Sequence, residues 1–257
     1  MPSMKQIIKF LFILCLGSFV LACGDKANFL DSVAPATGAR VKFYHLAPDL
    51  SGVDFYINDQ RFSGVNTVPP ASAASVTYNN SFPIQDYALI TPGTAKVKVV
   101  APSSTTTTPG ATVATTDVST QADTYYSVFV YGNAPTYSTL TLTDNLTASD
   151  PTKAYIRLLN FVTGTTDANA TYDLVVNGTV VATGIAPLKG TAAFVPIPTI
   201  TYGSTAVPVQ IRPTGGSTVV VSGTIQPYAG RFYTILARGV FGGTGSQVVG
   251  MNISVNR

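Results

Sequence analysis

Several residue types that enzymes commonly use are rare or missing in this chain of 257 residues. It contains no glutamate and no tryptophan, and its only histidine is His45. A single histidine cannot form a His–His metal pair, and no Gly-x-Ser-x-Gly motif is present to hold a nucleophilic serine. These absences argue against a hydrolase. Because strong helix formers such as glutamate are scarce while Thr, Ser, Val, Gly and Tyr abound, the composition favours strands and turns.

Charge is equally sparse. Charged residues make up 11% of the chain, and the formal net charge is +3. The lysines and arginines form no basic stripe along the sequence, so we do not expect nucleic acid as a partner.

The chain also lacks an apolar run long enough to cross a membrane as a helix. Its leading apolar segment, residues 10–21, has about 12 residues, whereas a spanning helix needs about 20. The segment follows Lys5 and Lys9 and leads into Ala22 and Cys23. This arrangement resembles a bacterial lipoprotein signal peptide at residues 1–22, with Cys23 as the residue that is lipidated. A plain secretory signal cut near Ala22 is the alternative.

Cysteine usage supports the lipoprotein hypothesis. Cys15 would be removed with the leader, so Cys23 would be the only cysteine of the mature chain and no intramolecular disulfide could form. Acyl chains on Cys23 would anchor the protein firmly to a membrane. We expect a cell-envelope protein held at the outer membrane, because Gly24 rather than aspartate follows the cysteine. The sequence does not say which face of that membrane carries it.

Residues 23–38 are expected to form the lipidated start and a short tether. Within them, Asp31-Ser32-Val33 resembles a signal for O-glycosylation, which would modify Ser32. An unmodified, flexible tether is the alternative.

The remaining sequence repeats itself once. Residues 39–46 match residues 154–161, residues 53–59 match residues 172–178, and residues 125–132 match residues 232–239. The shared order predicts one copy at residues 39–150 and a second at residues 151–257. Each copy contains about seven short strand-like segments separated by Gly, Pro, Asn and Asp, which is typical of a β-sandwich.

Local patterns predict details of these strands. The pairs Asn58-Asp59 and Asn177-Gly178 predict tight hairpin turns, because these residues tolerate positive φ. The alternation in Val41-Lys42-Phe43 indicates a half-buried strand. Pro208 cannot donate to a ladder, so its strand is expected to be an edge or to carry a bulge.

A longer motif marks the first copy. The segment His45-Leu46-Ala47-Pro48-Asp49, followed by Val53-Asp54-Phe55-Tyr56-Ile57-Asn58, resembles the H-A-S-P-D-A-P-x-V-D-V-Y-V-N-G motif of the domain of unknown function 4397. Members of that family often occur as tandem copies, and many are bacterial envelope lipoproteins. The resemblance covers residues 39–257, although Asn160 replaces His45 in the second copy. It implies an all-β chain of two tandem immunoglobulin-like β-sandwich domains and no enzymatic role.

Three residues are the first candidates for chemistry, and a structural role is expected for each. His45 stands at a strand end before Pro48 and would bond the following turn. Asp54 and Asp173 occupy equivalent places inside apolar strands. A carboxylate there could belong to an acid–base pair, but the same residue in both copies is better explained by bonds to nearby backbone amides or by a solvent-facing position. We therefore expect no catalytic residue.

A weak calcium candidate lies in the second copy. Asp167, Asn169, Thr171 and Asp173 place oxygen-bearing side chains at alternate positions, as calcium loops do. Tyr172 stands where such loops have glycine, and no glutamate closes the segment, so a polar turn is the alternative. No other metal and no cofactor are expected.

Four tyrosines are the best candidates for a ligand surface. Tyr125, Tyr126 and Tyr131 lie close together on one expected strand, and Tyr137 follows. Exposed rings stack well on the apolar faces of sugars, whereas tyrosines that alternate in a strand more often belong to the core.

The sequence therefore supports three functional hypotheses. The first is a non-enzymatic envelope lipoprotein with a structural or adhesive role. Its expected partners are the membrane, through the lipid anchor, and a cell-surface glycan or an envelope protein. The second is a module that binds glycans or peptides through the tyrosines and loops. The third, a hydrolase, has the least support. Neither a ligand nor an oligomeric state can be named.

Overall fold

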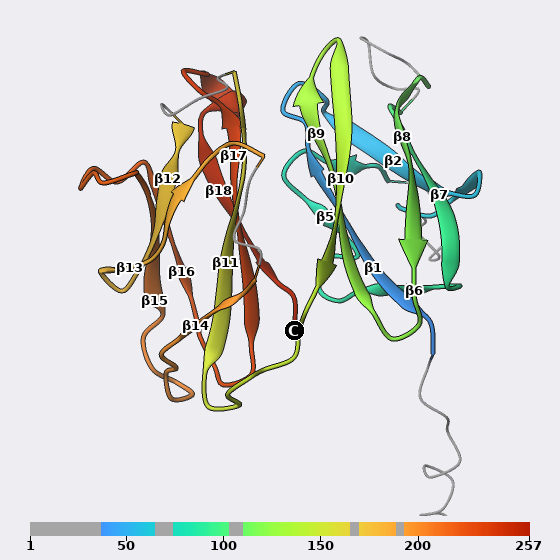
Figure 1. Cartoon of the computed structure of the whole chain (residues 1–257). Helices are drawn as coiled ribbons and strands as arrows, with labels where there is room; N and C mark the ends of the chain where they lie inside the picture. Colours follow the sequence, from blue (N-terminus) through green and yellow to red (C-terminus); the bar gives the residue numbers. More distant parts are fainter. Residues whose placement is uncertain (1–36, 65–73, 103–109, 165–169, 189–192) are drawn as a thin grey trace, which may run out of the picture. The chain divides into compact units, whose positions relative to one another are not determined.

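A computed structural model describes residues 37–64, 74–102, 110–164, 170–188 and 193–257 (Figure 1). In these ranges the chain forms 18 strands, no α-helix and a short 3-10 turn at Gly245–Gln247. The same ranges contain no helix with the length and apolar character needed to cross a bilayer. The expected all-β class is therefore confirmed.

The first half of the chain forms two sheets. One contains β10 (Thr136–Asp144), β9 (Tyr125–Asn133) and β1 (Ala39–Leu46), and the short strands β5 (Ser81–Phe82) and β6 (Ala88–Ile90) both pair with β1. The other contains β3 (Gln60–Arg61), β2 (Gly52–Ile57), β7 (Gly93–Val100) and β8 (Thr112–Thr120), and β4 (Val76–Thr77) also pairs with β2. Strand β1 runs parallel to β9, whereas the other pairs are antiparallel.

The second half has the same strand order. One sheet contains β14 (Val195–Ile197), β11 (Ala154–Thr163), β17 (Phe232–Val240) and β18 (Gly250–Val255). The other contains β13 (Thr179–Ile185), β12 (Tyr172–Val176), β15 (Val207–Pro213) and β16 (Val221–Ile225). Strand β11 runs parallel to β17, as β1 does to β9. Each half is a sandwich of two sheets.

The predicted hairpin turns are confirmed. Asn58 and Asp59 have φ of 49° and 63° between β2 and β3, and Asn177 and Gly178 have φ of 49° and 80° between β12 and β13. These positive values are the reason why Asn, Asp and Gly stand there.

The prediction for Pro208 is wrong. Its strand β15 lies between β12 and β16, and neither of its ladders contains a register shift. The pairing with β12 begins only at Val209, and the Pro208 carbonyl accepts a hydrogen bond from the Asn177 N–H in the turn beyond. A central strand tolerates this proline because its missing N–H would lie beyond Val176, the last residue of β12 that pairs with β15.

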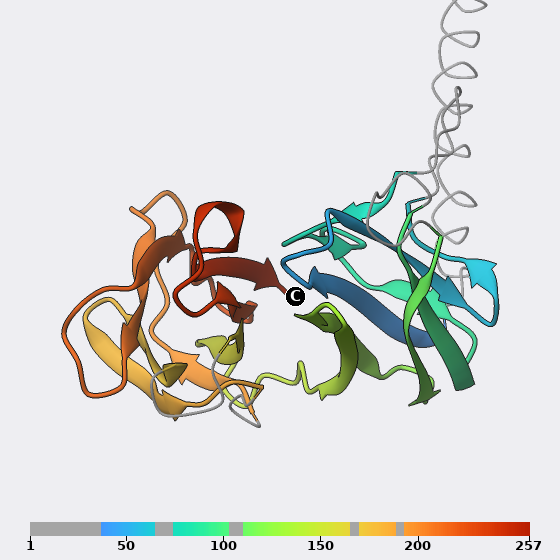
Figure 2. The ribbon, with the colours of Figure 1, turned by 90° about the horizontal axis from the view of Figure 1, so that it is seen from above.

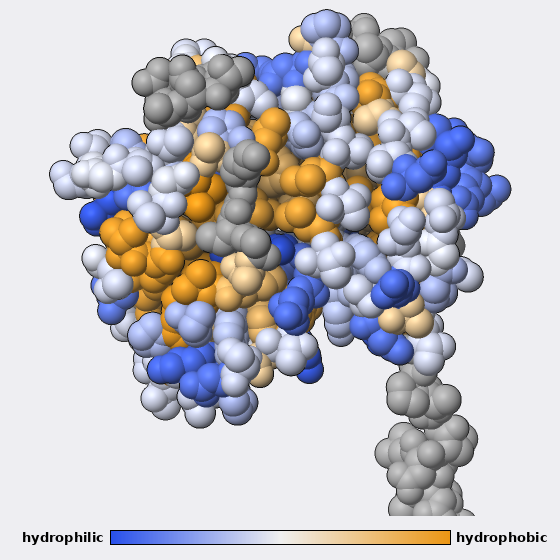
Figure 3. All heavy atoms as spheres, in the orientation of Figure 1, coloured by the Kyte–Doolittle hydropathy of each residue, from blue (hydrophilic) through white to orange (hydrophobic). Residues whose placement is uncertain are grey.

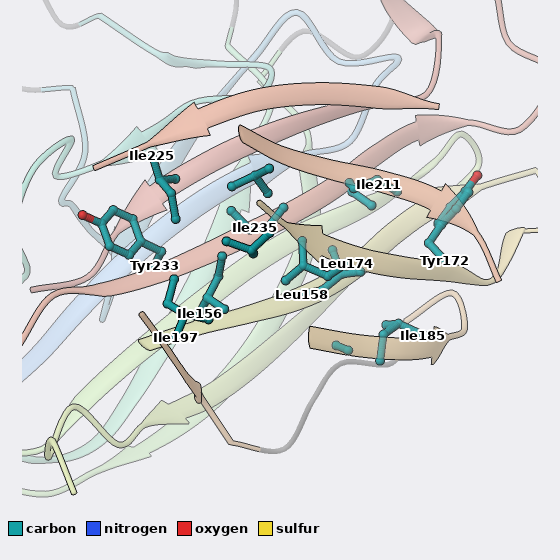
Figure 4. Close-up of a cluster of buried hydrophobic side chains, with 14 of the residues drawn as sticks. Ile156, Leu158, Tyr172, Leu174, Ile185, Ile197, Ile211, Ile225, Tyr233 and Ile235 are labelled. Atoms are coloured by element: carbon teal, nitrogen blue, oxygen red, sulfur yellow. The ribbon is translucent and has the colours of Figure 1, made fainter. Parts of the chain in front are cut away.

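Each sandwich has its own apolar core between its two sheets. The second core includes Ile156 and Leu158 from β11, Leu174 from β12, Ile211 from β15 and Ile235 from β17, which point toward one another in Figure 4. The first core is built in the same way around Phe43, Phe55 and Val128 (its remaining members are mostly Val and Ala). Alternate residues of each strand supply these cores, as the period of a β-strand requires.

A third apolar cluster draws on both sandwiches. Tyr44, Phe129 and Phe161 contact one another in sequence, with ring centroids 4.7 Å and 4.8 Å apart, and three leucines complete the buried cluster: Leu46, Leu159 and Leu236. These side chains come from the faces of β1, β9, β11 and β17 that point away from the two sandwich cores. Residues 38–257 accordingly form one compact unit. The alternation around Lys42 was therefore misleading, because β1 is buried on both faces and Lys42 is 0% exposed.

Candidate functional site

The most charged buried group of side chains lies between the two sandwiches. Arg157 of β11 donates from Nη2 to Asp144 Oδ1 at the end of β10, over 2.5 Å, and the two side chains are 4% and 0% exposed. Ser127 donates to the other carboxylate oxygen over 2.6 Å. The Arg157 guanidinium also lies 4.4 Å from the Phe194 ring centroid. Charges removed from water require such partners, because desolvation costs several kcal/mol per ion.

The ion pair belongs to a closed ring of hydrogen bonds. Arg157 Nε donates to Thr234 Oγ1 over 2.9 Å, and Thr234 donates to Asn256 Oδ1 over 2.7 Å. Asn256 Nδ2 donates to the Tyr87 hydroxyl over 2.6 Å, and that hydroxyl donates to Asp144 Oδ2 over 2.7 Å. The ring contains residues of both sandwiches, so it joins them through satisfied polar groups.

Lys42 adds a buried amine beside this ring. Its Nζ donates to the carbonyls of Val255 and Gln85 over 3.2 Å and 3.4 Å. Burial lowers the pKa of Lys42 to about 8, although the charges of Asp86 and Asp144 oppose the shift. Strands β1 and β18, which carry Lys42 and Val255, come together here (Figure 2).

Perturbed titration is common at active sites, but here its cause is burial. Burial raises the pKa of Tyr44 to about 12, and it raises the pKa of Tyr87 with further help from the Asp144 charge. Asp144, Arg157 and Lys42 are all buried, and each has its charged group engaged by partners within the protein. We interpret the ring as a structural connection.

His45 organises the loop that follows β1. The Ala47 N–H donates to His45 Nδ1 over 3.3 Å, and Nε2 donates to the Leu50 carbonyl over 3.0 Å. These partners require the neutral ring with its proton on Nε2. Burial accordingly lowers the pKa of His45 to about 4. The expectation that His45 bonds the turn is confirmed.

Asn160 performs the same task in the second sandwich. Its Oδ1 accepts from the Val162 N–H over 3.1 Å, and its Nδ2 donates to the carbonyls of Ala170 and Ile185 over 2.7 Å and 2.9 Å. Both side chains therefore accept from the amide two residues ahead and donate to a loop carbonyl. An amide can replace an imidazole in this role because both offer one acceptor and one donor.

Asp54 and Asp173 are both structural in this geometry, but they act differently. Asp173 accepts from the N–H groups of Gly184 and Gly215 over 2.9 Å and 3.0 Å, as expected for a carboxylate that caps backbone amides. Asp54 instead binds Arg61 of β3 over 2.6 Å. Burial opposes ionisation of Asp173, but the donors around it outweigh burial and lower its pKa.

The calcium candidate is only partly within the described residues. Asp167 and Asn169 lie outside them. Asp173 uses both carboxylate oxygens for bonds to Gly184, Gly215 and Thr183. In the described ranges no three acidic, histidine or cysteine side chains are grouped for a metal ion. Asp173 therefore organises a loop in this geometry, and the polar turn is the better interpretation.

The four candidate tyrosines do not form one platform. Tyr126 is 5% exposed in the first core, and its hydroxyl accepts from the Gln121 N–H over 3.0 Å. Tyr125 lies on the opposite face of β9 against Tyr87, with ring centroids 5.0 Å apart. Tyr137 donates to Asp49 over 3.0 Å. A surface shared by all four rings is excluded by Tyr126, which belongs to the core, the alternative for tyrosines that alternate in a strand.

Tyr131 lines the larger of the two clefts that contain a candidate tyrosine, and Tyr125 lines the other, of about 290 Å³. The larger cleft has a volume of about 610 Å³ and lies between β9, β10 and β11. Its lining includes the hydroxyls of Thr136, Ser138 and Thr163 and the apolar side chain of Leu188. None of its lining residues is charged. The Tyr131 ring also contacts Phe161, with centroids 5.6 Å apart.

Two further candidates, Cys23 and Ser32, lie outside the described residues. Sequence analysis also missed the buried ring entirely. One signal for it was available, because Lys42 and Arg157 occupy equivalent positions in the matching segments 39–46 and 154–161. A charge at the same place inside two apolar strands indicates a buried partner. Asn256 and Tyr87 carried no comparable signal.

The ring makes a prediction about stability. Asp144→Asn should lower the free energy of unfolding by about 3–5 kcal/mol, because Arg157 would remain buried without a counter-charge. Asp123→Asn is the matched control, since Asp123 pairs with Arg40 while 68% exposed and should cost at most about 1 kcal/mol. Chemical denaturation measures both. Equal, small losses for the two variants would contradict the importance of the ring.

His45 makes a prediction about pH. Its pKa is about 4 in the folded chain and about 6.5 when unfolded, so the unfolded state binds more protons between these values. Stability present above pH 6.5 should therefore fall by about 3 kcal/mol as pH drops toward 4. His45→Asn should remove this dependence, since Asn160 makes the same bonds with an amide. Lys42 titrates above this range and Asp173 below it. The free energy of unfolding is measured by denaturation at each pH. If it falls with pH as steeply for His45→Asn as for the parent, the assignment to His45 is refuted.

Comparison with known families gives one result. The model of a domain of unknown function, DUF4397, matches residues 39–167, half of the chain. The match starts with β1 and ends beyond β11, so it covers the first sandwich and the first strand of the second. A search of curated proteins finds no match. The chain belongs to the DUF4397 family of domains of unknown function.

Proposed function

We propose that this chain is a non-enzymatic lipoprotein of a bacterial cell envelope, in which two sandwiches act as one rigid structural or adhesive module. The observation that carries the proposal is the ring around Asp144 and Arg157, which ties both halves into a single unit. Such a unit suits a protein that transmits or resists force at a surface. The leader-like residues 1–22 and Cys23 supply the anchor.

The two sandwiches are proposed to be tandem copies of one immunoglobulin-like domain. The order β10-β9-β1-β6 in the first corresponds to β18-β17-β11-β14 in the second, and the order β3-β2-β7-β8 corresponds to β13-β12-β15-β16. His45 and Asn160 also make equivalent bonds at equivalent places. Duplication of one ancestral domain explains both correspondences.

No catalytic activity is part of the proposal. The groups that would have to react are already engaged: His45 holds a loop, Asp173 caps backbone amides, and Asp54 binds Arg61. The proposed location is the outer membrane, and the proposed partners are the membrane and an envelope protein or glycan.

Glycan binding is a second candidate because of the cleft beside Tyr131. One aromatic ring, three hydroxyls and no charged side chain suit a neutral sugar better than an anion or a peptide terminus. A glycan array should then show binding that Tyr131→Ala abolishes and Tyr56→Ala, on the outer sheet of the first sandwich, does not. Binding to no glycan, or equal binding by both variants, would leave only the structural role.

The anchor is tested at Cys23. Cys23→Ser should abolish acylation, so that the protein leaves the membrane fraction or keeps its leader. Mass spectrometry of the native N-terminus should find a diacylated or triacylated Cys23. Ser32→Ala is the control, since it alters the tether without touching the anchor. A mature chain that starts elsewhere with a free thiol would overturn the proposal.

A further inference from the structure

Two neighbouring tyrosines, one exposed and one partly buried, lie at one end of the second sandwich. Tyr202 lies in the turn between β14 and β15 and is 90% exposed. The Ser204 N–H donates to the Thr201 carbonyl over 3.0 Å, which places Tyr202 at the tip of that turn. Tyr228, between β16 and β17, has its ring centroid 5.9 Å from that of Tyr202. A ring so exposed leaves a large apolar surface in water, which is the usual mark of a contact site.

The loops that carry this pair are fixed to one another. The Ile200 N–H donates to the Pro227 carbonyl over 3.1 Å, and Thr199 Oγ1 donates to the Thr152 carbonyl over 3.2 Å. The Tyr228 hydroxyl donates to Gln226 Oε1 over 2.9 Å. The tyrosines therefore stand on a braced end of the sandwich.

The same end carries the start of β1. Strand β18 runs antiparallel to β17, which places Val255 beside Tyr233, close to the loop of Tyr228. The Val255 carbonyl accepts from Lys42 near the start of β1. The Gly38 carbonyl, just before β1, accepts a hydrogen bond from the Asp123 N–H. Strand β1 starts at the lower end of the molecule in Figure 1. The tyrosine pair and the point where residues 1–37 join the body thus share one end.

We propose that this end faces a lipid bilayer and that Tyr202 and Tyr228 enter its headgroup region as a second contact beside the lipid on Cys23. The inference rests on the proposed lipid anchor. Only 14 residues separate Cys23 from Gly38. At no more than about 3.5 Å per residue, they reach about 50 Å at most. An anchored chain would keep this end within that distance of the membrane.

The chemistry of this end suits a membrane surface. Tyrosine prefers the headgroup level because its ring is apolar and its hydroxyl is polar. Two cations lie near the pair. Arg231 is exposed three residues after Tyr228, and the Lys153 carbonyl accepts a hydrogen bond from the Gly230 N–H, which places Lys153 beside the same loop. Both side chains can meet lipid phosphates. Asp150 is the nearby opposing charge, and it already accepts hydrogen bonds from Thr152.

An apolar groove extends this surface. It has a volume of about 300 Å³, and Pro198, Ile200 and Val207 contribute to its lining. Figure 3 shows apolar residues gathered over β13, β14 and β15, where the groove opens. Ile200 belongs to the same loop as Tyr202, so the groove and the tyrosine tip lie close together.

The absence of tryptophan makes the test direct. In Tyr202→Trp the new side chain is the only indole in the protein, and its exposure keeps the fold unstrained. Phe241→Trp is the matched control, because Phe241 is 44% exposed and follows the other end of β17. Each variant is purified with its lipid and reconstituted into vesicles of phosphatidylethanolamine and phosphatidylglycerol.

The expected result is flotation of both variants, with a blue shift and several-fold stronger quenching by brominated lipid for Tyr202→Trp than for Phe241→Trp. Tyr228→Trp should behave like Tyr202→Trp. Flotation with equal, weak quenching overturns the second contact and leaves the lipid anchor standing. An emission change with a glycan instead of vesicles also overturns it. Failure of both variants to float overturns the anchor itself, and the inference with it.

Discussion

The ion pair between Asp144 and Arg157 is the contact on which the arrangement of the two sandwiches depends. It is almost completely shielded from water, so neither charge is stable without the other. Tyr87 and Ser127 donate to the second oxygen of the carboxylate, and Thr234 accepts from the Nε of the guanidinium. Asn256 closes the ring by joining Thr234 to Tyr87. Contacts among Tyr44, Phe129 and Phe161 supply buried apolar surface between the two sandwiches. The directional hydrogen bonds of the ring determine how the two facing sheets are aligned.

Hydrogen bonds to loops also account for the polar residues of the family motif. His45 and Asp49 are its two most reactive residue types, and both are used to hold loops. His45 closes the loop after β1, while Asp49 accepts from Tyr137 and from the Ala134 N–H at the turn between β9 and β10. These two residues of the motif therefore hold together the loops at one end of the first sandwich. A residue pattern that recurs across a family can record folding requirements as readily as a reaction.

The sequence was sufficient for the all-β class and for the hairpin turns, because composition and positive φ are local properties. Asn58 and Asn177 could be placed from two residues each. The sequence was insufficient where the other sandwich covers the outer face of a strand. The period of two around Lys42 separates the faces of a strand, but it cannot say whether the polar face meets water or another sandwich. For the same reason the sequence left two alternatives for Tyr126, and the structure places it in the core.

The position of Asn256 in the sequence has a consequence for the order of folding. The ring joins Tyr87 to Asn256, which lies 169 residues further along the chain. Contacts so distant in sequence form late, since the intervening segment must first be ordered. Until then Arg157 and Asp144 remain hydrated and the faces of β1 and β11 stay apart. The two sandwiches can therefore become fixed to one another only after the chain as far as Asn256 has been made.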